Sequence, residues 1–363
     1  MKNLIKKILV YLNLSVVVLL FFSYLSEYIS PEKIWVIAFF GLAYPYILAI
    51  NFLFLLYWII LKKRYFLISL IAILLGWSNL KKLVQLRPAK EFSAKQFTTI
   101  KLISYNVRLF NYYRWVHDNS IPANIFKFFK SENPDIICLQ EYFTLDKGEY
   151  SAESIVNKFS STPYRNIKYT SITKGLSNFG IATFSSYPIV NKGYIKFENS
   201  LNICIYSDIK INNDTIRVYN THLQSIRLKK NNYNFIDSLI LSYNNKHLDE
   251  VKDISSRLKH AYIKRARQVD ILSAHIRQSP YPVIVCGDFN DTPVSYTYHK
   301  MKGKLVDTFV ESGSGIGNTY LGNFPSFRID YIFHSKSFHS CCFQTERMNM
   351  SDHYPVMCTL SLN

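Results

Sequence analysis

The residues with the most chemistry to offer in this sequence stand where short apolar segments end. Eight such segments, rich in Val, Ile, Tyr and Phe, recur after residue 98 and have the composition and length of β-strands. Six strand ends carry Asn, Asp, Glu or His side chains: Asn106, Glu141, His222, Asp288 with Asn290, Asp330, and Asp352 with His353. One polar strand end is ordinary, because strand ends face solvent, but six are more than chance predicts. If the strands pack as two sheets, these ends can converge on one rim.

Side chains of these types favour the hydrolysis of a phosphoester. Carboxylate and amide oxygens are hard ligands, which suit Mg²⁺ or Mn²⁺ better than zinc. Four carboxylates held close together repel one another, so a divalent cation is needed for all of them to ionise. A histidine beside an aspartate can be oriented and kept basic or cationic. Metal, histidine and an activated water together make phosphoester cleavage the natural hypothesis.

Six short motifs resemble those of the endonuclease/exonuclease/phosphatase superfamily, which has the deoxyribonuclease-I-like fold. They are "SYNV" at 104–107, "LQE" at 139–141, "NTHL" at 220–223, "GDFND" at 287–291, "RIDYIF" at 328–333 and "SDHYPV" at 351–356. The motif "GDFN" alone is weak, but six motifs in the family's order are a strong signal. The resemblance covers about residues 98–363. It implies a four-layer α/β sandwich, with two packed mixed sheets flanked by helices and a metal site at one rim.

The resemblance also implies which residues hold the metal. Glu141 would be the principal ligand with Asn106 beside it, and Asp352 a further metal-site or orienting carboxylate. Whether one or two ions of Mg²⁺ or Mn²⁺ operate stays open. Arg108, just after "SYNV", either touches the substrate phosphate or is a solvated surface residue. Asn220 is expected to be a structural hydrogen-bonding residue rather than a catalytic one.

Catalytic roles follow from the same resemblance. Asp288 would position or deprotonate the attacking water, and Asn290 would hold the phosphate. His353 would contact the phosphate or act as a base, with Asp330 as its carboxylate partner. His222 would contact the phosphate or protonate the leaving oxygen. The expected enzyme is therefore a metal-dependent phosphoric ester hydrolase.

Two segments of the same region have helical patterns. Residues 121–134 carry Pro122 near the start and end at Asn133-Pro134. Residues 260–280 place an apolar stripe on one helical face. Between them, 226–259 is polar and rich in Lys and Asn, which predicts a helical insertion or a mobile surface segment. We expect one catalytic domain over 98–363, with this insertion.

The first 80 residues predict about three transmembrane helices, over 8–26, 34–61 and 65–80. A helix needs ~20 apolar residues to cross a bilayer, so the first two runs qualify and the third is marginal. A cleaved signal peptide is disfavoured for the first run, because no small-residue cleavage site follows it. A buried soluble helix is the alternative for the third run. Residues 81–97 would then link the transmembrane region of 1–80 to the catalytic domain.

Basic residues suggest an orientation for these helices, because cytoplasmic loops are enriched in Lys and Arg. Lys2, Lys6 and Lys7 precede the first run, and Lys62, Lys63 and Arg64 follow the second. Three spans would then put the catalytic domain outside the cytoplasm. The basic residues after the third run, Lys81, Lys82, Arg87 and Lys90, argue the other way, and the domain is cytoplasmic if the third run does not span.

Composition indicates which classes of partner are favoured but does not identify one. Half of the net charge of +18 lies in residues 1–95, so the remainder is moderately basic, which suits a phosphate-bearing partner or an anionic membrane. The six cysteines lie in strand-like runs without metal-site spacing and are expected to be core residues. Aromatic residues near Asn106 (Tyr112, Tyr113 and Trp115) suit stacking on nucleic acid or a place in a membrane interface.

Three functions are compatible with these observations. A membrane-anchored phosphodiesterase acting on nucleic acid, as an endonuclease does, is slightly favoured. A lipid-headgroup phosphodiesterase of the sphingomyelinase type, or a phosphatase at the membrane, is the alternative. A non-enzymatic binding module is disfavoured, because binding alone would not require His222, Asp288 and His353 together.

Overall fold

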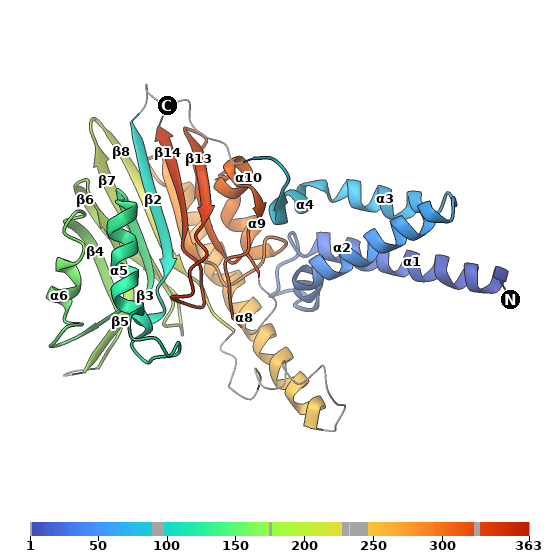
Figure 1. Ribbon diagram of the computed structural model, residues 1–363, viewed down its shortest axis with the longest axis horizontal. Coiled ribbons are helices and arrows are strands. Elements are labelled where there is room, and N and C mark those ends of the chain that lie inside the picture. The colour runs from blue at the N-terminus through green and yellow to red at the C-terminus, as the bar shows by residue number, and fades with distance from the viewer. Residues whose placement is uncertain are drawn as a thin grey trace.

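The computed structural model describes residues 2–88, 98–173, 176–226, 232, 246–322 and 327–362. Two six-stranded sheets pack face to face, helices cover their outer faces, and a bundle of N-terminal helices projects from one side (Figure 1). The expected four-layer α/β sandwich with mixed sheets is confirmed.

The first sheet has the order β13-β14-β2-β3-β5-β4 and the second the order β10-β12-β9-β8-β7-β6. The strands of the first are β2 (Thr99–Asn106), β3 (Ile136–Leu145), β4 (Tyr164–Thr173), β5 (Ser177–Ser185), β13 (Phe338–Thr345) and β14 (Val356–Leu362). Those of the second are β6 (Ile189–Lys196), β7 (Ile203–Ile211), β8 (Asp214–His222), β9 (Val283–Asp288), β10 (Val306–Asp307) and β12 (Asp330–His334). Each sheet contains one parallel pair, β2 with β3 and β8 with β9. Parallel neighbours end at the same edge, so these two pairs bring polar strand ends together.

Apolar side chains fill the space between the sheets and the space under the helices. Leu102, Cys138, Val218 and Ile284 belong to the buried cluster between the two sheets. The first sheet carries α5 (Ile121–Glu132) and the short α6 (Ala152–Asn157) on its outer face, with η1 (Arg108–Asn111) following β2. The second carries α8 (Lys246–Arg277) and α9 (Tyr296–Lys302), and α10 (Thr308–Ser312) packs against β12 and β13, at the edge where the two sheets meet. Of the six cysteines, five are buried and Cys342 is half-buried.

Both predicted helices exist, with different lengths. Residues 121–134 form α5, which ends where Asn133 adopts a left-handed conformation. Of residues 260–280, those up to Arg277 form the second half of α8, which begins at Lys246 and so includes part of the predicted polar insertion. The rest of that insertion lies mostly outside the described residues.

Asn220 joins the two sheets, as expected for a structural residue. From β8 its side-chain nitrogen donates to Leu139 O at 3.3 Å and Ala182 O at 2.9 Å, both in the first sheet. Its side-chain oxygen accepts from Gln140 Nε2 at 2.7 Å. All these groups are buried, and a buried polar group without a partner is costly, so the network fixes one sheet against the other.

The N-terminal bundle consists of α1 (Lys2–Leu25), α2 (Val36–Ile60), α3 (Phe66–Leu75) and α4 (Trp77–Leu83). Two helices, Asn3–Leu25 and Val36–Ile60, are long and apolar enough to cross a membrane. A buried polar network ties the bundle together: Asn13 Nδ2 donates to Ser69 Oγ at 2.7 Å, and Trp58 Nε1 donates to Asn13 Oδ1 at 3.1 Å. Such interhelical hydrogen bonds are typical of packed membrane helices.

The third apolar run is not the single helix predicted over 65–80. It breaks at Gly76 into α3 and α4, whose axes differ by 71°. The Tyr24 hydroxyl donates to Ala72 O at 2.9 Å, the carbonyl that Gly76 N would use in a continuous helix, and Gly76 N turns to Ile73 O. A Cβ on Gly76 would lie 2.1 Å from the Tyr24 hydroxyl oxygen, so this packing requires glycine.

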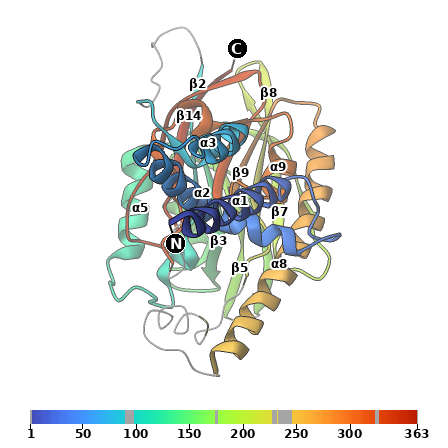
Figure 2. The same ribbon diagram turned by 90° about the vertical axis from the view of Figure 1, so that its right-hand side faces the viewer.

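One end of the bundle is fixed to the sandwich (Figures 1 and 2). In the α1–α2 connection, Ser26 Oγ donates to Val294 O at 3.0 Å and buried Glu27 pairs with Lys82 at 2.6 Å. Arg328 Nη2 in turn donates to Lys82 O at 3.0 Å. The predicted linker over 81–97 is therefore partly packed against the sandwich: β1 (Val84–Gln85) pairs with β11 (Gly315–Ile316), and 89–97 lie outside the described residues.

Candidate active site

The polar strand ends meet at one rim, as the sequence predicted. In the second sheet, His222 at the end of β8 stands beside Asp288 at the end of β9, and Asp288 stands beside Asp330 at the start of β12. In the first sheet, Asn106 ends β2 beside β3, which carries Glu141. Tertiary packing of the two sheets joins both sets, because Asn106 Nδ2 donates to Asp288 Oδ2 at 3.0 Å.

A β-bulge turns Glu141 toward the rim. The pairing of β3 with β5 shifts register between Leu139 and Tyr142, and Glu141 has a φ of +50°. A positive φ is uncommon for a residue with a Cβ, and bulges of this kind re-aim side chains beside active sites. Glu141 lines the pocket, and Asn106 Nδ2 lies 3.5 Å from its Oε1. Burial raises the pKa of Glu141, so its ionised form needs a nearby positive charge.

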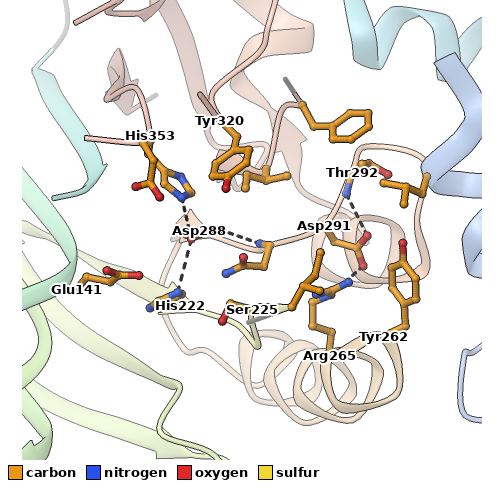
Figure 3. Close-up of a pocket in the computed structure, with 16 residues that line it drawn as sticks. Glu141, His222, Ser225, Tyr262, Arg265, Asp288, Asp291, Thr292, Tyr320 and His353 are labelled. Atoms are coloured by element: carbon orange, nitrogen blue, oxygen red, sulfur yellow. Dashed lines mark hydrogen bonds and ion pairs between the residues drawn. The ribbon is translucent and has the colours of Figure 1, made fainter. Parts of the chain in front are cut away.

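Asp288 lies at the centre of the cluster (Figure 3). Its Oδ2 is 3.5 Å from His222 Nε2 and 3.6 Å from His353 Nε2, and its Oδ1 accepts from Asn290 N at 2.8 Å. Burial raises the pKa of Asp288, while the two histidines oppose that shift. A carboxylate with a raised pKa is a better proton acceptor than an ordinary one.

The strand geometry around Asp288 depends on two backbone features. Gly287 faces Thr221 on β8, where a Cβ would lie 1.9 Å from Thr221 O, so only glycine allows β9 to pair so closely. Asn290 adopts a φ of +53°, which Asn tolerates better than most residues. Asn290 Nδ2 donates to Leu223 O at 3.0 Å, and the side chain lines the pocket.

His353 is held by a carboxylate on each side. Its Nδ1 lies 2.9 Å from Asp330 Oδ2, and its Nε2 faces Asp288. Burial disfavours the charged imidazolium, but the nearby charges of Asp330 and Asp288 outweigh it and raise the pKa of His353 well above its usual value. The ring is therefore oriented with Nε2 toward the pocket centre.

The remaining predicted site residues lie on one side of this cluster. Asp352 lines the same pocket, and its Oδ2 is 3.4 Å from Arg108 Nε. The Arg108 guanidinium also stacks over Trp115, at 4.7 Å from the ring centroid. Arg108 lines an adjoining hollow together with Asp352 and Tyr320 rather than the pocket that contains Asp288.

Several residues around the site were not singled out from the sequence. Ser351 Oγ donates to Asn106 O at 2.8 Å and accepts from His353 N at 3.2 Å, which ties "SDHYPV" to the end of β2. The Tyr320 ring packs 5.2 Å from the His353 ring. Arg265 and Asp291 form a buried pair with 3.2 Å between Nε and Oδ2, and both line the pocket. Ser351 could have been inferred from its place in the motif, but Tyr320 and Arg265 carry no local signal.

The donor set fits a divalent cation. Glu141, Asp288 and Asp352 all present carboxylates to one pocket, and hard oxygen ligands are those that Mg²⁺ and Mn²⁺ take. Asp330 Oδ1 is buried and meets no hydrogen-bond donor in the described part of the chain. Asp288, Asp330 and His353 can each offer a ligand atom within 4.8 Å of the others, but these atoms already bond to one another or face one another.

Comparison with known proteins identifies the family to which the sandwich belongs. Residues 103–353 match the profile described as the endonuclease/exonuclease/phosphatase family. The chain belongs to this family. Residues 6–83 match a second profile, described as a domain of unknown function (DUF8431). The comparison with curated proteins gave no match.

Solved structures of the endonuclease/exonuclease/phosphatase fold resemble the sandwich at low sequence identity. A family member from Bacteroides vulgatus is 13% identical with a TM-score of 0.52, covering 73% of this chain and 100% of that one. The human Nocturnin catalytic domain with bound sulfate is 16% identical with a TM-score of 0.51, covering 73% and 94%. Humanized TDP2 from D. rerio is 14% identical with a TM-score of 0.50, covering 72% and 99%. At these identities the likeness shows the fold.

Family membership and the site agree on the class of reaction. The chain is a metal-dependent phosphoric ester hydrolase of the endonuclease/exonuclease/phosphatase type. The family uses a divalent metal, and Asp288, Asp330 and His353 form one candidate cluster of ligand atoms at the rim.

Proposed function

We propose that the protein is a membrane-anchored phosphodiesterase that uses Mg²⁺ or Mn²⁺. The observation that carries this proposal is the arrangement around Asp288, where two histidines approach one carboxylate oxygen from either side while Asn106 fixes it from the opposite sheet. Water would attack phosphorus, one P–O bond would break, and the products would be an alcohol and a phosphomonoester.

Three residues would hold the ion. Glu141 is the principal ligand in this proposal, Asp352 a further or orienting carboxylate, and Asn106 would ligate through Oδ1. As the chain stands, Asn106 turns its Nδ2 to Glu141 and Asp288, and a half-turn of the amide would exchange the two atoms. A bound divalent ion would neutralise the phosphate oxygens and the charge that develops on them during cleavage.

The other residues of the rim would move protons and hold the phosphate. Asp288 would position the attacking water and accept its proton, which its raised pKa favours. His353, oriented by Asp330, would contact the phosphate or act as base, and His222 would contact the phosphate or protonate the leaving oxygen. Asn290 would donate an N–H to a phosphate oxygen. Arg108 would contact a substrate group in the adjoining hollow.

Two substrate classes have support in the structure. Exposed Tyr113 and Trp115 beside Arg108 could stack on bases, which favours the nucleic acid expected from the sequence. A lipid headgroup is favoured by the pocket itself, which Leu42 of α2 lines together with the catalytic residues. A phosphatase acting on monoesters at the membrane would use the same ligands.

Turnover of a generic diester tests the proposal. The full chain in detergent micelles should hydrolyse bis(4-nitrophenyl) phosphate with Mg²⁺ or Mn²⁺ and lose this activity when EDTA removes the metal. Restored activity after the metal is added back would show that the loss was not denaturation. Equal turnover with and without EDTA, or none with either ion, would contradict the proposal.

We also infer that the catalytic domain lies outside the cytoplasm. Lys6 Nζ lies 5.1 Å from the Tyr65 ring centroid, so the start of α1 and the basic 62–64 loop share one end of the bundle. The sandwich is fixed at the other end, through Ser26 and Glu27. Lys82, which argued for the opposite orientation, pairs with buried Glu27. The basic end is expected on the cytoplasmic side.

A reporter fusion tests this orientation. Alkaline phosphatase fused after Asn363 should be active, because it folds only outside the cytoplasm, and a β-galactosidase fusion at the same position should be inactive. The reverse pattern would place the domain in the cytoplasm. Fusions made after Arg64 serve as the control and should give the opposite result to those made after Asn363.

A further inference from the structure

The pocket over the rim is shared between the sandwich and a candidate membrane helix. Its polar end is formed by Glu141, His222 and His353, and its other end includes Leu42 of α2. Figure 3 shows Glu141, His222 and His353 on one side of Asp288 and Tyr262 on the far side. Tyr262 contacts Phe39 of α2, with 5.7 Å between ring centroids, so the Tyr262 end of the pocket is the α2 end.

Close packing around Gly41 holds α2 against the sandwich. A Cβ on Gly41 would lie 2.3 Å from Val294 O and 2.4 Å from Ser26 Oγ, so the backbones of α2 and the segment before α9 are in close contact. Ser26 and Gly41 are buried, and the Glu27–Lys82 ion pair lies nearby. Leu42 follows Gly41 directly and is half-buried, so its place in the wall is set by this contact.

The pocket changes character along its length. Carboxylates and histidines line it around Asp288, whereas its further lining combines the apolar side chains Leu42, Ile226, Phe327 and Ile329 with the Arg265–Asp291 pair, whose charges neutralise each other. A charged phosphoester would be attracted to the first part, where the metal would lie. An apolar portion of the same molecule would be matched by the second. This pattern fits an amphiphile better than a uniformly charged polymer.

An exposed apolar stripe continues from Leu42 along α2. Tyr46, Ala49 and Leu53 follow at i+4, i+7 and i+11, which places them on the same helix face. Tyr46 is 50% exposed and Leu53 is 65% exposed. Because α2 is long and apolar enough to cross a bilayer, this stripe would face lipid chains. Leu42 is six residues past Val36, about 9 Å along the axis, which would place it beside the upper part of the acyl chains in a spanning α2.

We propose that the substrate is a membrane phospholipid, whose phosphodiester lies at Asp288 and whose acyl chains run along the Leu42–Leu53 face of α2. This inference rests on the proposed function and narrows it to one substrate class. The N-terminal helices then form part of the binding site as well as the anchor. Water would cleave a P–O bond of the headgroup diester, leaving an alcohol and a phosphomonoester, with the proton from water passing to the leaving oxygen.

An assay of the full-length protein in lipid vesicles tests this proposal. The vesicles consist of phosphatidylcholine with added phosphatidylglycerol and phosphatidylethanolamine. The phosphate-containing products should be followed, and kcat/KM compared with that for the deacylated, water-soluble glycerophosphodiesters of the same headgroups. At least one lipid should exceed its soluble counterpart by about 10²-fold, because the chains add apolar contact. Single-stranded DNA and RNA are assayed in parallel.

Leu42→Gln provides the matched variant. It should lower turnover of the preferred lipid by about tenfold, since it places an amide where acyl chains would pass. Ile71→Gln, a change at a 56% exposed position of α3, is the control for a polar group in the apolar bundle and should have little effect.

The outcomes separate the two proposals. Lipid turnover no faster than that of the soluble glycerophosphodiesters, or faster turnover of DNA or RNA, overturns the lipid assignment and leaves the phosphodiesterase in place. Equal loss in Leu42→Gln and Ile71→Gln also overturns it, because the stripe would then have no special role. Absence of turnover on every diester, with metal present, would remove the proposed function itself.

Discussion

Replacing His353 with alanine should lower kcat/KM for bis(4-nitrophenyl) phosphate by about 10³-fold, within the range for loss of a proton-transfer residue. The reason is its geometry: Nε2 faces Asp288 at 3.6 Å while Nδ1 is held by Asp330 at 2.9 Å. No other described side chain contacts both carboxylates in this way. Steady-state kinetics of the full chain with Mg²⁺ or Mn²⁺ would measure the change.

His339→Ala is the matched control. This histidine is exposed on β13, with Nδ1 3.6 Å from Glu311, so its loss should change kcat/KM less than twofold. Equal activity of His353→Ala and His339→Ala would show that His353 has no part in the reaction.

The partner of His353 supplies an independent readout. Asp330→Asn keeps the shape of the side chain but removes the charge that orients and favours the imidazolium. We expect kcat/KM to fall by about 10²-fold and the pH profile of kcat to move to lower pH, because His353 loses the negative charge that contributes most to raising its pKa. In the double variant with His353→Ala the losses should not add, because Asp330 acts through His353. Fully additive losses would mean that Asp330 contributes by another route.

Glu141→Gln should abolish metal-dependent catalysis, with kcat lowered by about 10³-fold. The variant should also lose most of the thermal stabilisation that Mg²⁺ or Mn²⁺ gives, since a ligand that binds only the folded state raises its apparent stability. Thermal unfolding of the full chain in detergent, with and without each ion, measures this separately from activity.

Without metal, the same variant should be at least as stable as the parent. Burial raises the pKa of Glu141, so its ionised form destabilises the folded state above the unfolded pKa, and a neutral amide avoids that cost. Glu149→Gln is the control, because the Glu149 side chain is 77% exposed. An undiminished metal-induced shift of Tm in Glu141→Gln would exclude Glu141 as the principal ligand.

Local sequence was sufficient to predict the strands and the polar rim, because both depend on short-range patterns of residue type. The apolar runs became strands because their β-branched and aromatic side chains are buried on both faces, as along β9, where every residue from Val283 to Asp288 is buried. The polar residues at their ends predicted the rim, because parallel neighbours such as β8 and β9 must end at the same edge.

Local sequence could not predict the conformation of residues that depends on contacts with distant parts of the chain. Glu141 points into the pocket because of a bulge against β5, and nothing in "LQE" itself specifies a bulge. Tyr320 reaches His353 from a loop without strand or motif signal. The third apolar run was predicted as one helix from its apolar composition. Gly76 costs only about 1 kcal/mol in a helix, so the packing of Tyr24 from α1 decides the break.

The sequence by itself indicated the family, through six motifs that resemble those of the endonuclease/exonuclease/phosphatase family in their order. The polar residues at its strand ends predicted which side chains gather at the rim, because strand-end position is a local feature of sequence. Only the tertiary structure decided that a helix of the N-terminal bundle contributes to the lining of the pocket. Leu42 and Asp288 are far apart along the chain, and no periodicity in either segment refers to the other. Both residues line one pocket because Gly41 packs closely against Val294. This contact depends on the complementary shapes of two surfaces, and those surfaces form only when the chain folds.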